Sequence, residues 1–386
     1  MLQNEQFELQ PGVRTSFGVG SVKKLGKRVK SLGAARAFVV TDRGLVAAGI
    51  VDRVRAALEV ERVSVEVFDG VKANPTVESA HAGGEKLRAN LDAVVIALGG
   101  GSSLDAAKAI ALLGPNGGRC QDYSFGCRPD KPGRPIVAVP TTAGTGSETN
   151  MFGVVTDTAI GRKILVAHPS VLAQMVVLDP ELTVDVPPRV TGTCGMDVLT
   201  HAVEAFTSRR ANPMTDAIAL RAIAMVGEYL PRAFHEGSDL EARSQMLLAS
   251  HLAGIAFTSS GLGMCHAMGH PLSARLDAAH GQTLATLLPE VMRFNLPTCL
   301  AKYAEVAHAL AAAEPAASLE ANAQQAIAAV EKLRARVGTD LRGRELGLDP
   351  TSVPTLVEDA FADVLMASTP RTPEPADVAR IYQTIY

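Results

Sequence analysis

The sequence predicts an α/β domain with a parallel sheet over residues 1–188, followed by an all-α domain over residues 189–386. Three observations carry this prediction. Short apolar runs alternate with segments of helical pattern up to residue 188, which is typical of a parallel sheet with helices on its faces. After Val186-Pro187-Pro188 the short apolar runs end. Segments rich in Ala, Leu and Met then follow, and their composition favours helices.

Five short apolar runs are the predicted strands of the sheet, at residues 37–41, 63–68, 93–98, 136–140 and 175–178. Such runs, bounded by turn residues, are typical of strands that are buried on both faces. Two further runs, at residues 154–157 and 163–166, flank a short turn at Gly161 and predict a hairpin. In the second domain, residues 215–234 and 240–258 are predicted helices.

Length and composition indicate an enzyme-sized globular protein. With 386 residues, of which 47% are hydrophobic, the chain can bury the cores of two domains. The formal net charge is −3, so no overall basic field favours a nucleic acid or a membrane as a partner. The polar start Met1-Leu2-Gln3-Asn4-Glu5-Gln6 lacks the pattern of a signal peptide, and no apolar run approaches the ~20 residues of a membrane helix. We therefore expect a cytoplasmic protein.

The cysteines agree with that expectation. Their number is odd and they lack close paired spacing, as expected of reduced thiols; they are Cys120, Cys127, Cys194, Cys265 and Cys299.

One carboxylate and three imidazoles form a candidate metal site. Asp197 and His201 are four residues apart, and a four-residue step on a helix returns the side chain to nearly the same face. His266 and His280 follow in a second stretch rich in Gly and Ala. A mixed oxygen and nitrogen shell suits a borderline divalent metal such as iron, zinc, cobalt or nickel. The alternative is that each histidine is a buried, hydrogen-bonded residue of an Ala-rich helix.

A glycine turn after the third predicted strand is a candidate phosphate site. The strand runs into Gly99-Gly100-Gly101-Ser102, and a helix is predicted to follow through Asp105 and Lys108. Glycines let backbone amides approach an anion closely, Ser102 is a suitable N-cap, and a helix N-terminus carries a partial positive charge. A pyrophosphate would fit there. The glycine spacing is not the dinucleotide fingerprint, so a plain tight turn is the alternative.

Two other strand ends point to the same ligand. Asp42 follows the first predicted strand, where a carboxylate can bind an adenosine ribose and would repel a 2′-phosphate, which favours NAD over NADP. The alternative is that Asp42 caps the helix that begins near Gly44. The strand ending at Pro140 leads into a loop of hydroxyls and glycines that includes Thr141, Thr142 and Ser147. Such a loop offers many hydrogen-bond donors to a polar ligand, whereas an ordinary surface turn is the alternative.

Taken in order, these motifs resemble the iron-dependent (group III) alcohol dehydrogenase family over about residues 10–300. The resemblance is carried by Thr41-Asp42, Asn74-Pro75-Thr76, residues 99–108, residues 140–148, residues 195–206, His266-Ala267-Met268-Gly269-His270 and His280-Gly281. It implies a dehydroquinate synthase-like architecture. It also implies a metal-dependent, NAD(H)-linked alcohol dehydrogenase or aldehyde reductase that acts on a small alcohol or diol by hydride transfer. Ser103 and Ala279 stand where the family often has proline, but neither change removes a ligand.

The resemblance also assigns roles to residues. The metal ligands are Asp197, His201, His266 and His280, with Fe²⁺ the first expectation and Zn²⁺ the second. His270, four residues after His266, stands near the nicotinamide and is the candidate relay of the hydroxyl proton; a structural role is the alternative. The residues expected along NAD are Asp42, Asn74, Gly99, Gly100, Gly101, Ser102, Asp105, Thr141, Thr142, Ser147, Lys163 and Leu182. A homodimer is the expected assembly.

Three other functions are compatible with parts of the sequence. The two histidines of residues 266–270 have the spacing of a zinc peptidase helix, but Ala267 stands where that chemistry needs a glutamate. A dehydroquinate-synthase-like or glycerol-phosphate-dehydrogenase-like enzyme would need basic side chains for its phosphorylated substrate. Residues 192–206 and 261–281 supply only Arg275. A filament or scaffold protein would assemble without turnover. Phe152 and Phe257 are the candidate liners of a substrate pocket.

Overall fold

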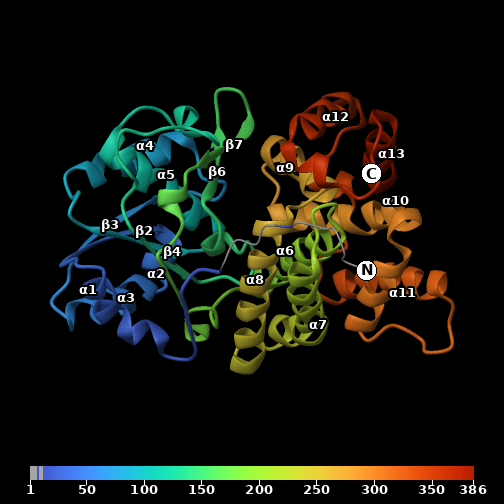
Figure 1. Cartoon of the computed structure of the whole chain (residues 1–386), viewed down its shortest axis with the longest axis horizontal. Helices are drawn as coiled ribbons and strands as arrows, with labels where there is room; N and C mark the ends of the chain where they lie inside the picture. Colours follow the sequence, from blue (N-terminus) through green and yellow to red (C-terminus); the bar gives the residue numbers. More distant parts are fainter. Residues whose placement is uncertain (1–6, 8–11) are drawn as a thin grey trace. The chain divides into compact units, whose positions relative to one another are not determined.

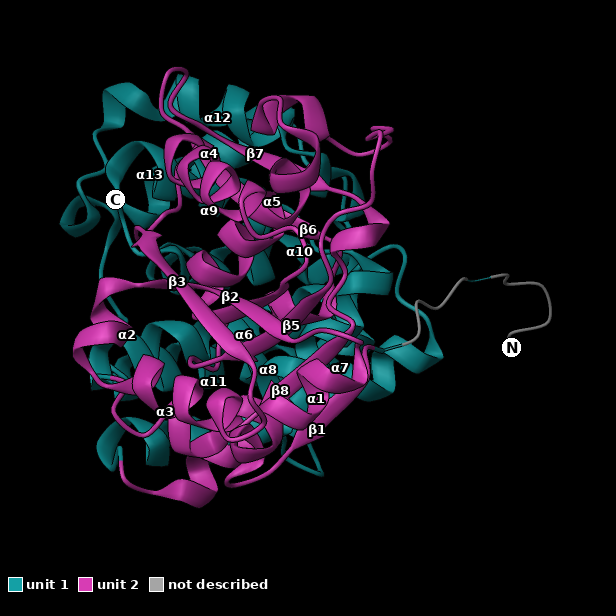
Figure 2. Ribbon diagram, turned by 90° about the vertical axis from the view of Figure 1, so that its left-hand side faces the viewer, with its two compact units in different colours: residues 1–12, 187–237, 249–386 teal, residues 13–186, 238–248 magenta. Residues whose placement is uncertain are grey.

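The structure, a computed structural model, describes residue 7 and residues 12–386. This part of the chain divides into two compact units, which are coloured separately in Figure 2. The α/β unit comprises Val13–Val186 and Ser238–Leu248. The helical unit comprises Pro187–Gly237 and Ala249–Tyr386, with the described residues before Val13. The predicted domains, residues 1–188 and 189–386, stay a prediction.

The α/β unit is built on a sheet of six parallel strands in the order β1-β8-β5-β4-β2-β3, of which β2, β3 and β4 are labelled in Figure 1. The strands are β1 (Thr15–Phe17), β2 (Arg36–Asp42), β3 (Ser64–Val71), β4 (Val94–Gly99), β5 (Ile136–Pro140) and β8 (Met175–Leu178). The five predicted strands are confirmed. The strand β1 was not predicted, because its three residues contain no run of buried apolar side chains.

Alternating side chains of the strands face two separate cores. Phe38 and Val40 of β2 pack in the core that contains α4 (Val77–Arg88) and α5 (Gly101–Asn116). Val39 points the other way, into the core that contains α1 (Leu25–Ser31) and α3 (Ile50–Glu59). Because both faces are covered, the central strands β4, β5 and β8 are fully buried, which is the pattern that made them visible in the sequence. A short helix, α2 (Arg43–Ala47), follows β2 directly.

The predicted hairpin is confirmed. The strands β6 (Phe152–Asp157) and β7 (Arg162–Ala167) pair in antiparallel fashion, with Thr156 opposite Lys163. Val155 and Val166 pack with α5 in the core of the α/β unit. The hairpin is therefore fastened to the helix that follows the glycine turn.

The helical unit contains long helices, as predicted. They are α6 (Pro188–Thr207), α7 (Pro213–His235), α9 (Met264–Leu276), α10 (His280–Ala309), α11 (Leu319–Arg336), α12 (Val353–Ala362) and α13 (Pro375–Ile385), together with the second half of α8 (Leu240–Ser260). The start of α7 shows how the sequence fixes a boundary. The Asn212 side chain accepts hydrogen bonds from the N–H groups of Met214 and Thr215, and Pro213 occupies the first helical position.

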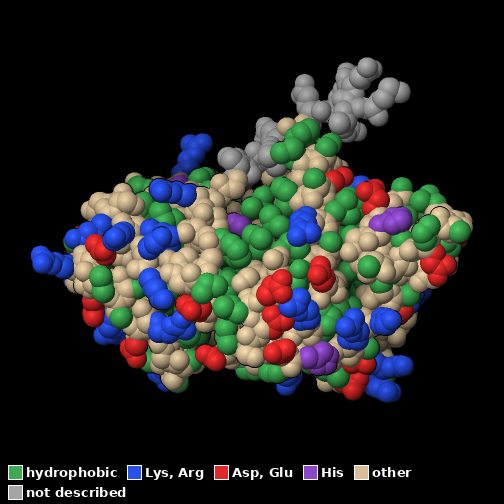
Figure 3. Space-filling model, turned by 90° about the horizontal axis from the view of Figure 1, so that it is seen from below, with side chains coloured by type: hydrophobic (Ala, Val, Ile, Leu, Met, Phe, Trp, Pro, Cys, Tyr) green, Lys and Arg blue, Asp and Glu red, His purple; other side chains and the backbone are tan. Residues whose placement is uncertain are grey.

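The helices and the surface charge agree with the sequence predictions. Among the described residues, no single helix is long and apolar enough to cross a membrane. The helices α8 and α9 meet that criterion only when joined across a 110° bend. On the face drawn in Figure 3, basic and acidic side chains are interspersed, as expected from 37 basic and 40 acidic residues.

Candidate functional site

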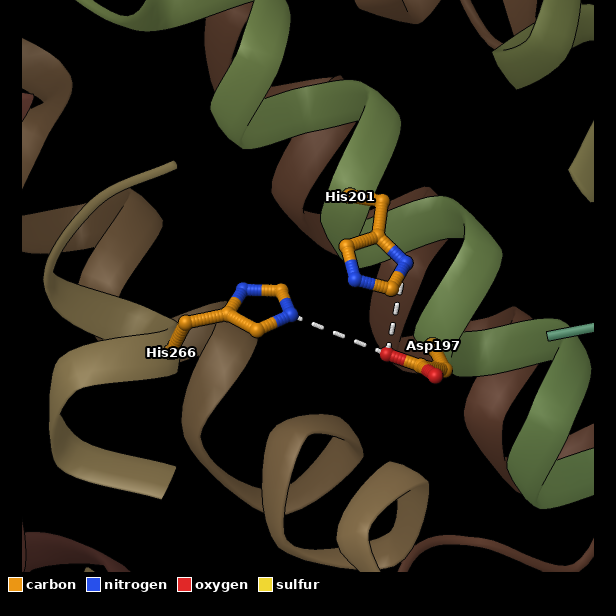
Figure 4. Close-up of side chains that lie close together, drawn as sticks. All are labelled: Asp197, His201 and His266. Carbon is orange, nitrogen blue, oxygen red and sulfur yellow. Dashed lines mark ion pairs between the residues drawn. The ribbon is translucent and has the colours of Figure 1, made fainter. Parts of the chain in front are cut away.

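Three helices of the helical unit bring the four predicted metal ligands together. Asp197 and His201 lie one turn apart on α6, and their Oδ1 and Nδ1 atoms are 3.4 Å apart. From α9, His266 places its Nε2 3.7 Å from the same Asp197 oxygen, as Figure 4 shows. From the first position of α10, His280 places its Nε2 4.0 Å from that oxygen. One carboxylate oxygen is therefore the centre of the cluster.

The cluster fits a divalent cation. The ligand atoms of Asp197, His201 and His266 all lie within 4.8 Å of one another, and all three residues are buried. His266 Nε2 has no hydrogen-bond partner among the residues that the structure describes. A buried polar atom without a partner is costly, and a metal ion would satisfy the nitrogen lone pair. The set of imidazoles and one carboxylate suits iron or zinc.

Glu204 fixes the orientation of His266. Its Oε2 lies 2.5 Å from His266 Nδ1, and its Oε1 accepts a 2.6 Å hydrogen bond from the N–H of Cys265. A carboxylate can only accept here, so Nδ1 carries the proton and Nε2 keeps its lone pair for a metal. Burial acts to lower the pKa of His266, but Asp197 and Glu204 outweigh it and raise that pKa to about 9. The two carboxylates thus favour a positive charge at His266, and a metal ion at Nε2 would take the place of the proton.

Sequence reasoning missed Glu204, although a signal was present. Glu204 follows His201 by three residues and Asp197 by seven, so all three lie on one face of α6. A carboxylate on the same helix face as two candidate ligands can be expected to hydrogen-bond to a further ligand and orient it.

Gly281 permits the approach of α10 to α6. A Cβ atom at this position would lie 2.1 Å from the Thr193 carbonyl oxygen and 3.3 Å from Asp197 Cβ. Any side chain would therefore separate the two helices, and His280 would move away from Asp197. The glycine after the last predicted ligand is a packing requirement of the cluster.

Aromatic rings surround the cluster. Phe257 stacks on His201, with ring centroids 4.7 Å apart. His270 stacks on His280 at 5.4 Å and stands edge-on to His266 at 6.0 Å. The helix α9 runs on through Pro271 as far as Leu276, so His266 and His270 share one helix.

Residues 192–206 and 261–281, which contain the proposed ligands, include one arginine, and its charge is neutralised. Arg275 forms a 2.6 Å ion pair with Asp359 of α12. A phosphorylated substrate would need a basic group near the ligands, and this arginine already has a carboxylate partner. The pairing counts against the two phosphate-using rivals.

In the α/β unit, the predicted phosphate turn begins α5. Gly99 has φ = +144°, which side-chain-bearing residues rarely adopt. A Cβ on Gly101 would lie 2.4 Å from Thr145 Cγ2, so the hydroxyl-rich loop packs directly on the helix start. The N-cap is Gly100 and the helix begins at Gly101, so our expectation that Ser102 is the N-cap was wrong. Thr141 donates its N–H to the Gly99 carbonyl at 3.0 Å.

Asp42 is the last residue of β2, and Asn74 follows the carboxyl end of β3. Asp42 Oδ1 accepts a 3.1 Å hydrogen bond from the N–H of Leu45, which confirms the helix-cap interpretation. Its other oxygen lies 3.5 Å from Ser103 Oγ. The expected ribose contact of Asp42 stays a prediction. Asn74 has φ = +50°, a left-handed conformation that asparagine tolerates better than most residues.

A buried lysine joins two other predicted cofactor residues. Lys108 donates to Ser147 Oγ and to the Ser147 carbonyl, at 2.8 and 2.6 Å. Asn150 Oδ1 and the Phe152 carbonyl also accept from it, at 2.8 and 2.6 Å. Ser147 Oγ in turn donates to Asp105 Oδ1 at 2.5 Å. Burial raises the pKa of Asp105 and lowers that of Lys108 to about 8, so both charges are held at a cost.

This network was not predicted, because nothing in the sequence shows that Lys108 is buried. It ties Asp105 and Ser147 to the protein itself, and their expected contact with the cofactor stays a prediction. Two further predicted cofactor residues are placed differently. Lys163 is half-buried on β7, whereas the Leu182 side chain, at the end of a 3₁₀ turn (Pro180–Leu182), packs inside a core. Thr142, whose Oγ1 would lie 3.1 Å from a Cβ on Gly100, faces the glycine turn.

Two family models cover most of the chain. The model described as iron-containing alcohol dehydrogenase matches residues 12–180. The model of the C-terminal part of the Fe-containing alcohol dehydrogenase family matches residues 191–386. The two matches follow one another along the chain without overlap.

Individual relatives agree over almost their full length. The chain is 39% identical to a probable alcohol dehydrogenase, EutG, of Salmonella typhimurium, across 95% of this chain and 92% of the relative. It is 37% identical to an NAD-dependent methanol dehydrogenase of Bacillus methanolicus, across 95% and 96% of the two chains. Among solved structures, a 1,3-propanediol oxidoreductase is 35% identical, with a TM-score of 0.95 over 99% of this chain and 100% of that one.

These likenesses confirm the predicted family, the fold class and the class of enzyme. The identity exceeds 30% and extends over nearly all of each relative. The chain belongs to the iron-containing alcohol dehydrogenase family.

Proposed function

We propose that this protein is a metal-dependent, NAD(H)-linked alcohol dehydrogenase that interconverts a small alcohol or diol and the matching aldehyde. The observation that carries the proposal is the buried cluster of Asp197, His201 and His266, with the partly exposed His280 beside it, in which Glu204 leaves His266 Nε2 ready for a metal. Relatives named for methanol and 1,3-propanediol favour a short substrate.

The metal is proposed to be Fe²⁺, with Zn²⁺ as the second choice, held by Asp197, His201, His266 and His280. When bound, such an ion supplies Lewis-acid chemistry toward an alcohol or carbonyl oxygen. The protein contributes the positions of the four side chains, and it buries three of them, Asp197, His201 and His266. Burial of this kind strengthens every electrostatic interaction inside the site.

The cofactor is proposed to be NAD, which supplies the acceptor or donor of a hydride. The glycine turn and the start of α5 are suited to its pyrophosphate, since backbone N–H groups and the helix dipole favour an anion there. Asp42 supports NAD over NADP, because a carboxylate at this strand end would repel a 2′-phosphate. Asn74, Ser102, Thr141, Thr142 and the other predicted positions are proposed to line the same ligand.

His270 is proposed to exchange the hydroxyl proton of the substrate. Its ring stacks on one proposed ligand and stands edge-on to another. An imidazole is the side chain best matched to proton transfer near neutral pH. Phe257, stacked on His201, is proposed to line the apolar part of the substrate site.

The experiment that tests this function begins with removal of metal by a chelator and restoration of Fe²⁺ or Zn²⁺ without oxygen. NADH absorbance is then followed with a panel of short alcohols and diols, and in reverse with the matching aldehydes. We expect metal-dependent turnover that favours NAD over NADP and is lost in His266→Ala. Tight NAD binding without turnover on any member of the panel would instead favour the phosphate-using relatives of this fold.

Two further expectations belong to this proposal. We propose a homodimer, which light scattering on the purified protein would test against other assemblies. We also propose a cytoplasmic location, which cell fractionation would test.

A further inference from the structure

A carboxylate far along the chain contacts the proposed proton relay. Asp363 directly precedes a 3₁₀ helix, η8 (Val364–Ser368), and its Oδ2 lies 2.6 Å from His270 Nδ1. The two residues are 93 positions apart. The other oxygen, Oδ1, accepts a 2.9 Å hydrogen bond from the N–H of Leu365. Each carboxylate oxygen therefore has its own partner, and the backbone fixes which oxygen meets the imidazole.

The protonation of this pair follows from its partners. Oδ1 of Asp363 accepts from a backbone N–H and Oδ2 faces the imidazole, an arrangement that favours the ionised carboxylate. An ionised carboxylate only accepts hydrogen bonds, so His270 Nδ1 must carry a proton. The second ring nitrogen, Nε2, is then the atom that can take up or release a proton.

The same segment of chain holds α9 in a second place. Asp359 of α12 pairs with Arg275 near the end of α9. Asp359 and Asp363 thus both anchor α9, but only Asp363 contacts an imidazole that stacks on a proposed metal ligand. Asp359 can therefore only anchor α9, whereas Asp363 can also act on the reaction through His270.

We propose that Asp363 is the positioning residue that holds His270 in the tautomer and orientation needed for proton transfer, an inference that rests on the proposed function. During oxidation of the alcohol, the substrate O–H bond breaks and an N–H bond forms at His270 Nε2. The substrate loses a hydride to NAD⁺ and becomes the carbonyl product. The Nε2 proton then passes to water, while the bond from Nδ1–H to Asp363 is kept throughout. Asp363 stabilises the imidazolium and is not itself protonated.

Asp363→Asn provides a sharp test. The N–H of Leu365 still needs an acceptor, so the amide oxygen of the new side chain is expected to occupy the Oδ1 position. The amide NH₂ then faces His270 Nδ1, which must accept, and the proton moves to Nε2. The variant keeps the cap of η8 and the size of the side chain, so it is expected to fold while His270 adopts the wrong tautomer.

The tautomer is measured by ¹⁵N NMR on histidine-labelled, zinc-loaded protein, with His270 identified among the nine histidines by its absence in His270→Ala. We expect Nδ1–H in the natural protein, Nε2–H in Asp363→Asn, and no change in the matched control Asp359→Asn. An Nε2–H tautomer in the natural protein would overturn the proposal.

Kinetics provide the second readout. We expect Asp363→Asn to lower kcat by about 10–100-fold, with unchanged metal content and unchanged NAD affinity. In a His270→Ala background the same change should cost nothing further, because Asp363 acts through His270. An equal loss in both backgrounds would contradict the inference.

The outcomes separate the inference from the function on which it rests. If His270→Ala keeps full kcat, the proposed relay role of His270 is wrong. If His270→Ala loses activity but Asp363→Asn does not, only the role of Asp363 is wrong. Loss of activity in Asp359→Asn to the same extent would show that anchoring of α9 is what matters.

Discussion

Glu204 leaves His266 with one free ring nitrogen, and this has a measurable consequence for metal affinity. The carboxylate accepts from Nδ1 at 2.5 Å and from the Cys265 N–H at 2.6 Å, so it orients both the ring and the start of α9. Partners of this kind raise the basicity of a ligand nitrogen and fix its tautomer.

We therefore predict that Glu204→Gln weakens metal binding by about 10–100-fold. Competition with a chelator of known affinity measures the change. Glu228→Gln, at an exposed position of α7, is the matched control and should bind metal like the natural protein. Equal affinity in the two variants would show that Glu204 does not support the ligand.

A second prediction for a single residue concerns Lys108 and the pH dependence of the protein's stability. Burial lowers the pKa of this ammonium from 10.5 to about 8 in the folded protein. Between these values the unfolded chain binds more protons than the folded chain at this site, so the free energy of unfolding should rise with pH. The contribution of Lys108 to the free energy of unfolding should rise by about 3 kcal/mol when the pH passes from below 8 to above 10.5.

The measurement compares denaturant unfolding of the natural protein and Lys108→Met at several pH values. Because other groups also titrate there, the difference between the two proteins isolates the lysine. Lys108→Met should be destabilised already at pH 7, since four acceptors lose their donor, and the gap should widen above pH 8. If the difference in the free energy of unfolding between the two proteins becomes smaller with rising pH, the folded state favours the charged lysine.

At the scale of elements, the contact between α6 and α10 depends on one missing side chain. A Cβ at Gly281 would meet backbone of α6 at 2.1 Å, and backbone cannot move aside as a flexible side chain can. We predict that Gly281→Ala destabilises the protein by about 1–3 kcal/mol and lowers its metal affinity, because His280 is displaced with the helix.

Thermal unfolding and chelator competition check this prediction. Gly227→Ala is the control, since the one close contact of a Cβ there would be the end of the Leu310 side chain, at 2.9 Å, which can move; Leu310 Cα, at 3.6 Å, is at an ordinary contact distance. If Gly281→Ala binds metal as tightly as Gly227→Ala, His280 is not needed as a ligand.

Elements were predictable where burial left a continuous run of apolar residues. The strands β2, β4, β5 and β8 are apolar on both faces, and their runs were visible in the sequence. The strand β1 has three residues and no such run, so it was missed. The four candidate ligands could be named because histidines and a carboxylate with this spacing match a known family motif. Asp363 and Lys108 were not, because their roles depend on contacts over long sequence separations or on burial.

On the scale of the whole molecule, each proposed site is built within one unit. The four proposed metal ligands belong to the helical unit, and the glycine turn, Asp42 and Asn74 belong to the α/β unit. We predict that the two binding functions can be lost separately. Gly101→Ala, whose Cβ would lie 2.4 Å from Thr145, should weaken NAD binding about tenfold or more and leave metal content unchanged.

His266→Ala should show the reverse, with metal lost and NAD affinity kept. Calorimetry for NAD and elemental analysis for metal measure both properties in each variant. If either change abolishes both functions in a protein that remains folded, the assignment of one site to each unit is wrong.

The central claim is that the cluster around Asp197 holds the ion on which the reaction depends. The most direct test is to titrate metal-free protein with Fe²⁺ under nitrogen while measuring bound metal and the rate of NADH formation with a short alcohol. We predict that the rate rises in proportion to bound metal and stops rising at one ion per chain, and that His266→Ala shows neither binding nor turnover. Full turnover in the metal-free protein, or in His266→Ala, would contradict the claim.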